Sequence, residues 1–407
     1  MKKDNSTRQI IFLGHDRDIL EMYCKQYADI VWILHENAFN DDDLFIFKVK
    51  MILISDFENK NCILYLNELI DKEKILKCVS YHEIYHDLAN SIASFYGADS
   101  NIQFSLANTL TRDKKLAREI SNSLNPHSIK YYLIKTLADL ENILALNPHM
   151  QFILKPRVGT ASAKIKLISG KSDFKNDYFD GQDFLLEEYI DGKEYSVDTV
   201  SHQGIHRIIA VGENDFFDQT YIESAHRFGT ENCNLEWARI ERYVTKFLSK
   251  IKHINGLSHT EVRVNDKGVY LIESQLRGGG GYIENAIEIL TGHNAAKIAF
   301  QLDESPDFNL NNIKTTYLSD KIVSSEMLKY KINNAELIKW VGLEEALKIA
   351  GVHSIFPNKN NTVCKELADG FGRDIAILIV GNNESAIQKT LALVKKTLYP
   401  LLKGTYS

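Results

Sequence analysis

The 407-residue sequence lacks paired cysteines, a surplus of positive charge and any long apolar run. Its five cysteines are scattered and form no C-x-x-C pair, which argues against both a disulfide framework and a thiolate zinc site. Unpaired cysteines of this kind suit a reducing compartment, so we expect a cytoplasmic protein.

The charge balance and the short apolar runs exclude two further classes. A formal net charge of -6 leaves no basic surplus for wrapping nucleic acid. The apolar run near the N-terminus, IIFL, is too short for the core of a signal peptide, and no later run approaches membrane-spanning length. We therefore expect neither a nucleic-acid partner nor a membrane.

The first hundred residues predict a small doubly wound α/β domain. Apolar runs at 9–14, 30–34, 50–55 and 76–81 are typical of buried parallel strands, with helix-like segments between them. The segment EIYHDLANSIASFYG follows the fourth run, has helical spacing and ends at a glycine. The first turn, LGHDRD, lacks two glycines of G-x-G-x-x-G, so no dinucleotide is expected there.

From about residue 105 the pattern changes to α+β. TRDKKLAREISNSL predicts a charged helix, and FILKPRVGTASAKIKLI predicts strand, loop and strand. DFLLEEYIDGKEYSVDTVS predicts a hairpin of two strands around an Asp-Gly turn, and HTEVRVNDKGVYLIESQ predicts another hairpin, which turns at Asn265 to Gly268. DIAILIVG and NESAIQKTLALVKKTL predict a final strand and helix.

One motif in the first domain matches a metal site. His82, Glu83 and His86 form H-E-x-x-H, which on a helix presents two imidazoles to zinc with a glutamate as base. However, His82 stands at a strand-helix junction, and no third ligand follows in DLANSIASFYG. The motif is therefore a zinc site, an ordinary helix start, or a place where Glu83 acts alone.

The hairpin at 259–281 carries a second group of polar residues. Glu261 and Glu273 lie on opposite arms, and Gln275 and Arg277 share one strand face with Glu273 at i+2 and i+4. Two carboxylates and an amide oxygen suit Mg2+, and Arg277 would meet a phosphoryl group or a carboxylate. The alternative is a surface hairpin with ordinary charges.

Two earlier segments favour a nucleotide. In EEYIDGKE, a strand edge can offer backbone groups to a purine, and Glu194 can offer a carboxylate to ribose. Lys155 precedes the loop RVGTASAK, whose small residues let backbone N–H groups approach phosphate.

The order of these motifs resembles the ATP-grasp superfamily. Lys114 in RDK, Lys155 in LKP, the small-residue loop, LLEEYIDGKE, HTEV and IESQLRGGG follow one another across residues 9 to about 300. Within the superfamily, YIESAHRFG and GLSHTEVRV look most like the L-amino acid ligases that make dipeptides, such as the bacilysin and rizocticin pathway enzymes, and so suggest antibiotic biosynthesis. The sequence departs from the pattern at Gln275, where many members carry Asn, at Ala225 before His226, and at Ala161 and Ala163 in the phosphate loop.

The resemblance implies a fold, a domain order and cofactors. We expect a Rossmann-like domain at 1–105, a central lid subdomain at 106–190 and a C-terminal ATP-grasp domain at 191–407. ATP and Mg2+ would be the cofactors, with two Mg2+ ions that Mn2+ can replace, and amino acids would be the small-molecule partners of an enzyme that can form a homodimer.

The resemblance also implies roles for individual residues. ATP would contact Lys114, Lys155, Ser162, Glu187, Tyr189, Ile190 and Glu194. Glu261, Glu273 and Gln275 would ligate metal, and Arg277, His226 and Lys155 would act in catalysis. Substrate would contact Glu83, Glu223, His226, Arg277, Gly278 and Gly279. In this interpretation Glu83 receives the amino acid's ammonium group, and His82 and His86 are not zinc ligands.

The expected activity is ATP-dependent ligation of two L-amino acids through an acyl phosphate, with release of ADP and phosphate and with Arg as a candidate N-terminal substrate. One alternative is another ATP-grasp carboxylate-amine ligase, acting on a D-amino acid or a nucleotide-pathway amine. The other is a catalytically silent nucleotide-binding protein.

Overall fold

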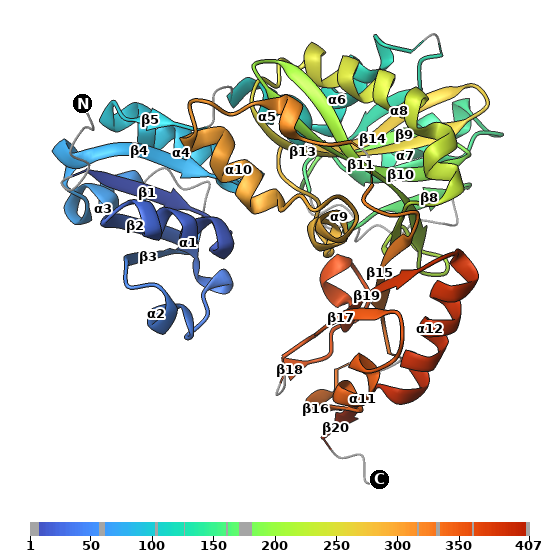
Figure 1. Ribbon diagram of the computed structural model, residues 1–407. Helices are drawn as coiled ribbons and strands as arrows, with labels where there is room; N and C mark the ends of the chain where they lie inside the picture. Colours follow the sequence, from blue (N-terminus) through green and yellow to red (C-terminus); the bar gives the residue numbers. More distant parts are fainter. Residues whose placement is uncertain are drawn as a thin grey trace.

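The protein has three lobes around a central antiparallel sheet, as the computed structural model in Figure 1 shows. The structure describes residues 8–56, 62–101, 105–125, 127–159, 162–170, 181–315, 317–330, 334–359 and 362–403. In this part of the chain no helix has the length and apolar character needed to cross a membrane.

The N-terminal lobe is a parallel sheet with helices, which confirms the prediction of a doubly wound domain. The sheet order is β3-β2-β1-β4-β5, and every neighbouring pair is parallel. Its elements are β1 (Gln9–Leu13), α1 (Arg17–Gln26), β2 (Asp29–His35), α2 (Asp43–Ile46), β3 (Lys50–Ile54), α3 (Cys62–Leu69), β4 (Ile75–Ser80), α4 (Glu83–Tyr96) and β5 (Asp99–Ser100). The strand order reverses between β1 and β4, and ligands of open α/β sheets bind beside such a reversal.

A four-stranded sheet forms a second lobe. Its order is β6-β9-β7-β8, with α7 packed against it. The bounds are β6 (Tyr131–Ile134), α7 (Leu137–Leu146), β7 (Phe152–Pro156), β8 (Lys166–Ile168) and β9 (Phe184–Glu188). The two strands around the Asp-Gly turn were expected to form a hairpin, and this is wrong: β9 belongs to this sheet, whereas β10 (Lys193–His202) belongs to the next. The turn is a crossing point between two sheets.

The central sheet has the order β14-β13-β10-β11-β12-β15-β19-β17. Its other strands are β11 (Ile205–Phe216), β12 (Glu223–Phe228), β13 (Gly256–Asn265), β14 (Gly268–Gln275), β15 (Ile322–Leu328), β17 (Val352–Pro357) and β19 (Ile375–Gly381). One core cluster joins it to α5 (Ser105–Arg112), α6 (Lys114–Asn122) and α8 (Glu231–Lys250), and another to α9 (Ile283–Thr291) and α10 (Ala295–Glu304). The hairpin predicted at Asn265 to Gly268 is confirmed as β13 and β14.

The charged helix predicted at 111–124 is shorter than expected. Asp113 interrupts it, because its side chain accepts hydrogen bonds from the N–H groups of Lys115 and Leu116 and so caps α6. Residues 111 and 112 end α5 instead. Ala107 and Ala117, within the predicted lid subdomain, pack in the same cluster as α8, and the domain boundaries stay a prediction.

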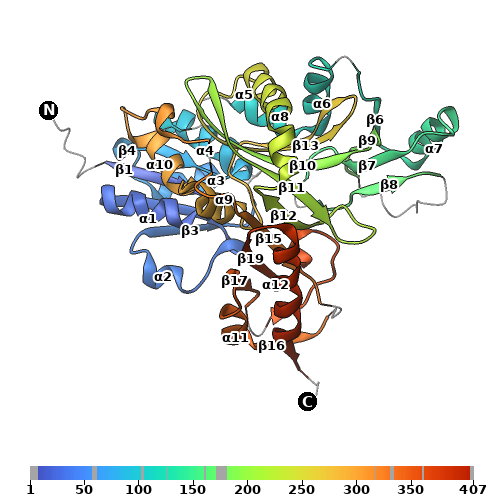
Figure 2. The ribbon, with the colours of Figure 1, turned by 45° about the vertical axis from the view of Figure 1, so that its right-hand side comes forward.

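The C-terminal lobe continues the central sheet. The predicted final strand and helix are confirmed as β19 and α12 (Glu384–Thr397). A small sheet of β18 (Thr362–Val363), β16 (Glu336–Val341) and β20 (Tyr399–Leu402) lies beyond them with α11 (Leu343–Leu347). Figure 2 shows α10 beside α1, where Asp303 accepts hydrogen bonds from Tyr23, Lys77 and Tyr81 and so ties the N-terminal lobe to the rest.

Candidate active site

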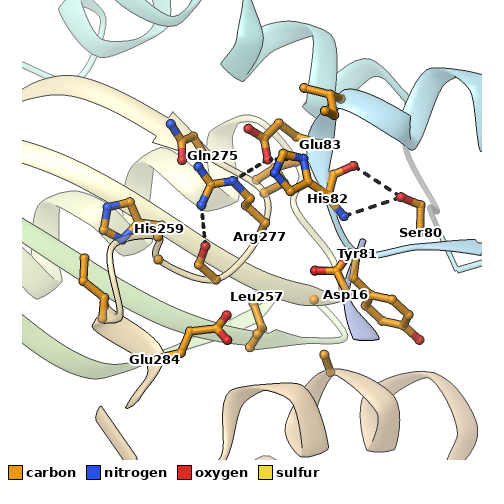
Figure 3. Close-up of a pocket in the computed structure, with 18 of the residues that line it drawn as sticks. Asp16, Ser80, Tyr81, His82, Glu83, Leu257, His259, Gln275, Arg277 and Glu284 are labelled. Carbon is orange, nitrogen blue, oxygen red and sulfur yellow. Dashed lines mark hydrogen bonds and ion pairs between the residues drawn. The ribbon is translucent and has the colours of Figure 1, made fainter. Parts of the chain in front are cut away.

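A cleft of about 1370 Å³ lies where the lobes meet. Its walls come from the turns after β1 and β4, from the β13 and β14 hairpin with its glycines, and from the C-terminal lobe. Figure 3 shows one part of it, where Glu83 and His82 face Arg277 and Gln275 across the opening. Because the walls are distant in sequence, the cleft brings together residues that the sequence predicted separately.

The predicted metal carboxylates lie on neighbouring strands. Glu261 of β13 and Glu273 of β14 are register partners, and both line the cleft. Lys114 Nζ lies 3.0 Å from Glu273 Oε2, and the Gln275 amide also donates to Glu273. Burial alone would raise the pKa of Glu273, but Lys114, Gln275 and Lys155 together outweigh it and lower the pKa. The same carboxylate is therefore ionised and already attracts a cation.

These side chains fit a divalent cation. Burial raises the pKa of Glu261, and the carboxylates of Glu223 and Glu273 add to this effect. The His259 imidazole, 3.7 Å from Glu261 Oε1, opposes the shift, and Glu261 and Glu273 bring two carboxylates to one wall of the cleft. Mg2+ is usually held by one or two carboxylates together with substrate phosphates, so a cluster of three protein ligands is not needed. Among the described residues no group of three His, Cys, Asp or Glu side chains could hold a metal.

Lys155 and Glu187 form a buried ionic cluster with Arg118. Lys155 Nζ lies 2.6 Å from Glu187 Oε2, and Arg118 Nε donates to Glu187 Oε1 at 2.8 Å. Burial alone would raise the pKa of Glu187, but the two cations outweigh it and lower the pKa to about 2. Burial lowers the pKa of Lys155, and Glu187 opposes this shift. Glu187 therefore fixes Lys155 at the edge of the cleft.

Arg263 connects three of the predicted ATP-binding residues. Its guanidinium lies 5.5 Å from the centroid of the Tyr189 ring, donates to the Ile190 carbonyl at 3.0 Å and donates to Glu194 Oε2 at 2.7 Å. Burial, together with Glu261, raises the pKa of Glu194 to about 7. The segment after β9 is thus held against β13 by one arginine that sequence reasoning missed.

Glu83 and Arg277 form an ion pair across the cleft. Arg277 Nε lies 2.6 Å from Glu83 Oε2, and its Nη1 donates to the Gly278 carbonyl at 2.7 Å (Figure 3). Glu83 is the first residue of α4, whereas His82 precedes the helix with extended backbone angles. His86 is buried, and burial lowers its pKa to about 4. Glu83 thus faces the cleft from the turn after β4, at the switch point of the sheet.

Steric contacts explain why glycines follow β14. A Cβ atom at Gly278 would lie 1.8 Å from Glu284 Oε1, and one at Gly279 would lie 2.9 Å from His259 Nδ1. The Gly279 N–H donates to Asp198 Oδ1 at 3.1 Å. Burial alone would lower the pKa of His259, but Asp198 and Glu261 outweigh it and raise the pKa to about 10. Side chains at these glycines would displace the acidic and imidazole groups behind them.

Ser162, Glu223 and His226 lie together. Ser162, with a φ of 56°, donates to Glu223 Oε1 at 3.4 Å, and Arg373 Nη2 donates to Glu223 Oε2 at 2.5 Å. His226 Nδ1 lies 3.0 Å from Asn214 Oδ1, which can only accept, so Nδ1 carries the proton and Nε2 is left as an acceptor. Burial, with Arg373 and His259 nearby, lowers the pKa of His226 well below its usual range. Thr160 and Ala161 of the same loop lie outside the described residues.

Sequence reasoning missed several charged residues of the site. His259 had a signal, because it stands two residues before Glu261 on the same strand. Asp16 had one too, since it follows β1 at the switch point. Arg118 and Arg373 had none, because each reaches its partner only through the tertiary fold.

Comparisons with known proteins define the class. Residues 149–285 match the family model of the ATP-grasp domain, so the chain contains an ATP-grasp domain. No curated protein matches the sequence. Together with the architecture described above, the match confirms the expected ATP-grasp fold.

Solved structures share the fold along the whole chain. An L-amino acid ligase from Bacillus licheniformis superposes with a TM-score of 0.79 at 16% identity and covers 98% of this chain and 99% of its own. A carboxyaminoimidazole ribonucleotide synthase from Aspergillus clavatus, complexed with ATP, has a TM-score of 0.72 at 13% identity, covering 96% and 99%. A phosphoribosylglycinamide synthetase from Anaerococcus prevotii has a TM-score of 0.66 at 15% identity, covering 97% and 100%.

Proposed function

We propose that the protein joins two L-amino acids into a dipeptide at the expense of ATP. The proposal rests on one observation: two kinds of charged group face each other across the same cleft. On one side lie Glu261, Glu273 and Lys155, with Lys114 paired to Glu273, and this set suits the phosphates of a metal-bound nucleotide. Across from them lies the ion pair of Glu83 and Arg277, which suits the ammonium and carboxylate of an amino acid.

The reaction would proceed in two steps. A carboxylate oxygen of the first amino acid attacks the γ-phosphorus of ATP, and the bond to ADP breaks to give an acyl phosphate. The amine of the second amino acid then attacks the acyl carbon, and phosphate leaves. Of the three protons on its ammonium group, one stays on the amide, one leaves with phosphate and one is released. Mg2+ bound at Glu261, Glu273 and Gln275 would neutralise phosphate charge.

The protein's own residues would act by position and charge. Lys155, fixed by Glu187, and Lys114, beside Glu273, would hold the phosphates. Arg277 would stabilise the acyl phosphate, and the neutral His226 would accept a hydrogen bond from the incoming amine at Nε2. Arg263 would keep Tyr189, Ile190 and Glu194 in place for adenine and ribose.

Arg as the N-terminal amino acid is the finer part of the proposal. Asp16 and Glu284 line the same cleft as Glu83 (Figure 3), and among the described residues Asp16 Oδ2 is buried with no hydrogen-bond partner. Burial raises the pKa of Asp16 to about 6. Burial, followed by Asp16 and Asp198, raises the pKa of Glu284 to about 7. Positive charge on a substrate side chain would relieve this repulsion.

The test is phosphate release from Mg-ATP across all pairs of amino acids, with the product identified by mass. We expect a dipeptide from some pairs and none from the Glu273→Gln variant. A product containing a D-amino acid or a nucleotide-pathway amine would point to another carboxylate-amine ligase. Tight ATP binding with no phosphate release from any acceptor would point to a silent nucleotide-binding protein.

A further inference from the structure

The C-terminal lobe contributes a cation to the cleft that the proposed reaction has not used. Arg373 lies just before β19 and lines the cleft. Its Nη2 donates to Glu223, while its Nε is buried with no hydrogen-bond partner in the described part of the chain. A guanidinium has five N–H donors, so this one retains donors for a further acceptor.

Arg373 is held rigidly at this place. Its carbonyl accepts a hydrogen bond from the Asn358 side chain at 3.0 Å. The next residue, Asp374, accepts from the Tyr330 N–H at 2.8 Å and lies 3.1 Å from Lys329 Nζ. A fixed backbone limits the loss of freedom when the side chain binds a ligand. This arrangement is typical of a binding residue that is organised in advance.

Arg373 also lies next to the reacting groups. A Cβ atom built at Gly281 would lie 3.6 Å from His226 Nε2 and 3.7 Å from Arg373 Nη1. The absence of a side chain at Gly281 therefore leaves a small space that both groups border. A molecule in this space would touch the imidazole and the guanidinium together.

Aromatic side chains line the same wall of the cleft. Tyr282 stacks on Phe356 with ring centroids 3.9 Å apart and an interplanar angle of 14°. Tyr282 has a φ of 64°, which is uncommon for a bulky residue and often marks a functional position. Phe371 lines the cleft although 69% of its surface is exposed. These rings offer apolar surface to a ligand beside Arg373.

We propose that Arg373, Tyr282, Phe356 and Phe371 form the subsite for the acceptor amino acid, with Arg373 binding its α-carboxylate and the rings packing on an apolar side chain. This inference rests on the proposed ligation. Charge complementarity assigns the donor amino acid to one end of the cleft and the acceptor to the other. The donor keeps its ammonium group and loses its carboxylate, so it suits the acidic end with Asp16, Glu83 and Glu284. The acceptor keeps its carboxylate and loses its ammonium charge, so it suits the end with the Arg373 guanidinium, whose Nε has no hydrogen-bond partner among the described residues.

Glu223 and His226 fit the same orientation. With the acceptor carboxylate on Arg373, its amine would lie near the Glu223 carboxylate, which can hold the ammonium form before attack. His226 Nε2 borders the same space and can accept a hydrogen bond when Nδ1 carries the proton. The amine would thus face the acyl phosphate between Arg277 and the phosphate-binding lysines.

The experiment compares Arg373→Gln with wild type, using L-phenylalanine and its carboxamide as acceptors with the donor found in the phosphate-release screen. We expect Arg373→Gln to raise the KM for L-phenylalanine at least about 10-fold and to change the KM for the amide less than about 2-fold, because the amide has no carboxylate. Mass spectrometry shows which amino acid ends at the C-terminus of the product. An equal effect on acid and amide, or an effect on the N-terminal amino acid, would overturn the subsite.

A second variant tests the aromatic wall without touching Arg373. Phe371→Ala should raise the KM for L-phenylalanine several-fold relative to that for L-alanine, because less apolar surface is buried. Matched controls are Phe95→Ala, an exposed aromatic residue on α4, and Arg239→Gln, an exposed arginine paired with Glu236. Neither control residue lines the cleft, and both variants should behave as wild type. An unchanged preference in Phe371→Ala would remove the rings from the proposal.

Calorimetry separates failure of the subsite from failure of the proposed function. We would measure binding of L-phenylalanine and its amide to both proteins with Mg-ADP present and no turnover. Acid binding that is lost in Arg373→Gln, in an enzyme that ligates no pair, would leave the subsite standing and refute the ligation. Turnover by Arg373→Gln with an unchanged KM for L-phenylalanine would leave the ligation standing and refute the subsite. The absence of both binding and turnover would refute both proposals.

Discussion

The ion pair between Glu83 and Arg277 gives the sharpest prediction, because two roles for Glu83 can be separated. Its carboxylate lies 2.6 Å from Arg277 Nε, and only 3% of its side chain is exposed. Glu83 can therefore position Arg277, receive the ammonium group of the donor, or do both. Glu83→Gln keeps the shape and removes the charge.

The magnitude follows from the contact. A hydrogen bond to a charged group contributes about 1.5 to 3 kcal/mol. Arg277 faces the cleft with 18% of its side chain exposed, so a middle value of about 2 kcal/mol is appropriate. At about 1.4 kcal/mol for each factor of ten, kcat/KM should fall about 30-fold. ATP affinity should stay the same, because Glu83 lies on the proposed amino-acid side of the cleft.

The assay is steady-state phosphate release with the donor amino acid varied. If Glu83 receives the ammonium group, the KM for the donor rises; if it only positions Arg277, kcat falls while that KM stays constant. The control is Asp87→Asn, also on α4, whose side chain is 54% exposed and pairs with Arg112 at 3.3 Å. Wild-type kcat and KM in Glu83→Gln would refute both roles, and stoichiometric zinc in the pure protein would revive the metal interpretation of H-E-x-x-H.

Three further predictions follow from the buried charges. Lowering of the Glu187 pKa from 4.5 to about 2 should add about 3 kcal/mol of stability that is present above pH 4.5 and lost as the pH falls toward 2. Urea unfolding should show that Glu187→Gln has lost this stability. The control variant Glu188→Gln, at the partly exposed neighbour, should unfold like wild type. Glu261→Gln and Glu273→Gln should each reduce phosphate release by at least about 100-fold and weaken the Mg2+ dependence of nucleotide binding, so normal Mg2+ titrations would contradict the metal assignment. Because the pKa of His259 is raised to about 10, its stabilising effect should be complete below pH 6.5 and disappear as the pH rises through about 10. The free energy of unfolding of His259→Gln should be lower than that of wild type by about 3 to 5 kcal/mol at neutral pH, and this difference should shrink as the pH rises toward 10. A difference that does not depend on pH would refute the prediction.

Local patterns in the sequence determined the elements of the fold. Continuous apolar runs predicted the four long strands of the parallel sheet, because strands covered on both faces need apolar residues throughout. The polar turn at Asn265 to Gly268 predicted the hairpin, and the two-residue period placed Glu273 and Gln275 on the face that lines the cleft. Arg277 was predicted on the same strand face and this is wrong, because β14 ends at Gln275, although Arg277 also lines the cleft. Each of these inferences needs only residues within about one element of each other.

The tertiary structure alone decided which sheet each strand joins and which charges meet. Nothing in the turn between β9 and β10 distinguishes a hairpin from a crossing, since the difference lies in the partners of the two strands. Arg118 and Glu187 are 69 positions apart, and Arg373 and Glu223 are 150 positions apart. Spacing in the sequence reports the face of a helix or strand, whereas an ion pair depends on how those faces pack. The sequence therefore determined the chemistry of the proposed nucleotide side of the cleft, and only the packing of the lobes brought Arg373 to the other side.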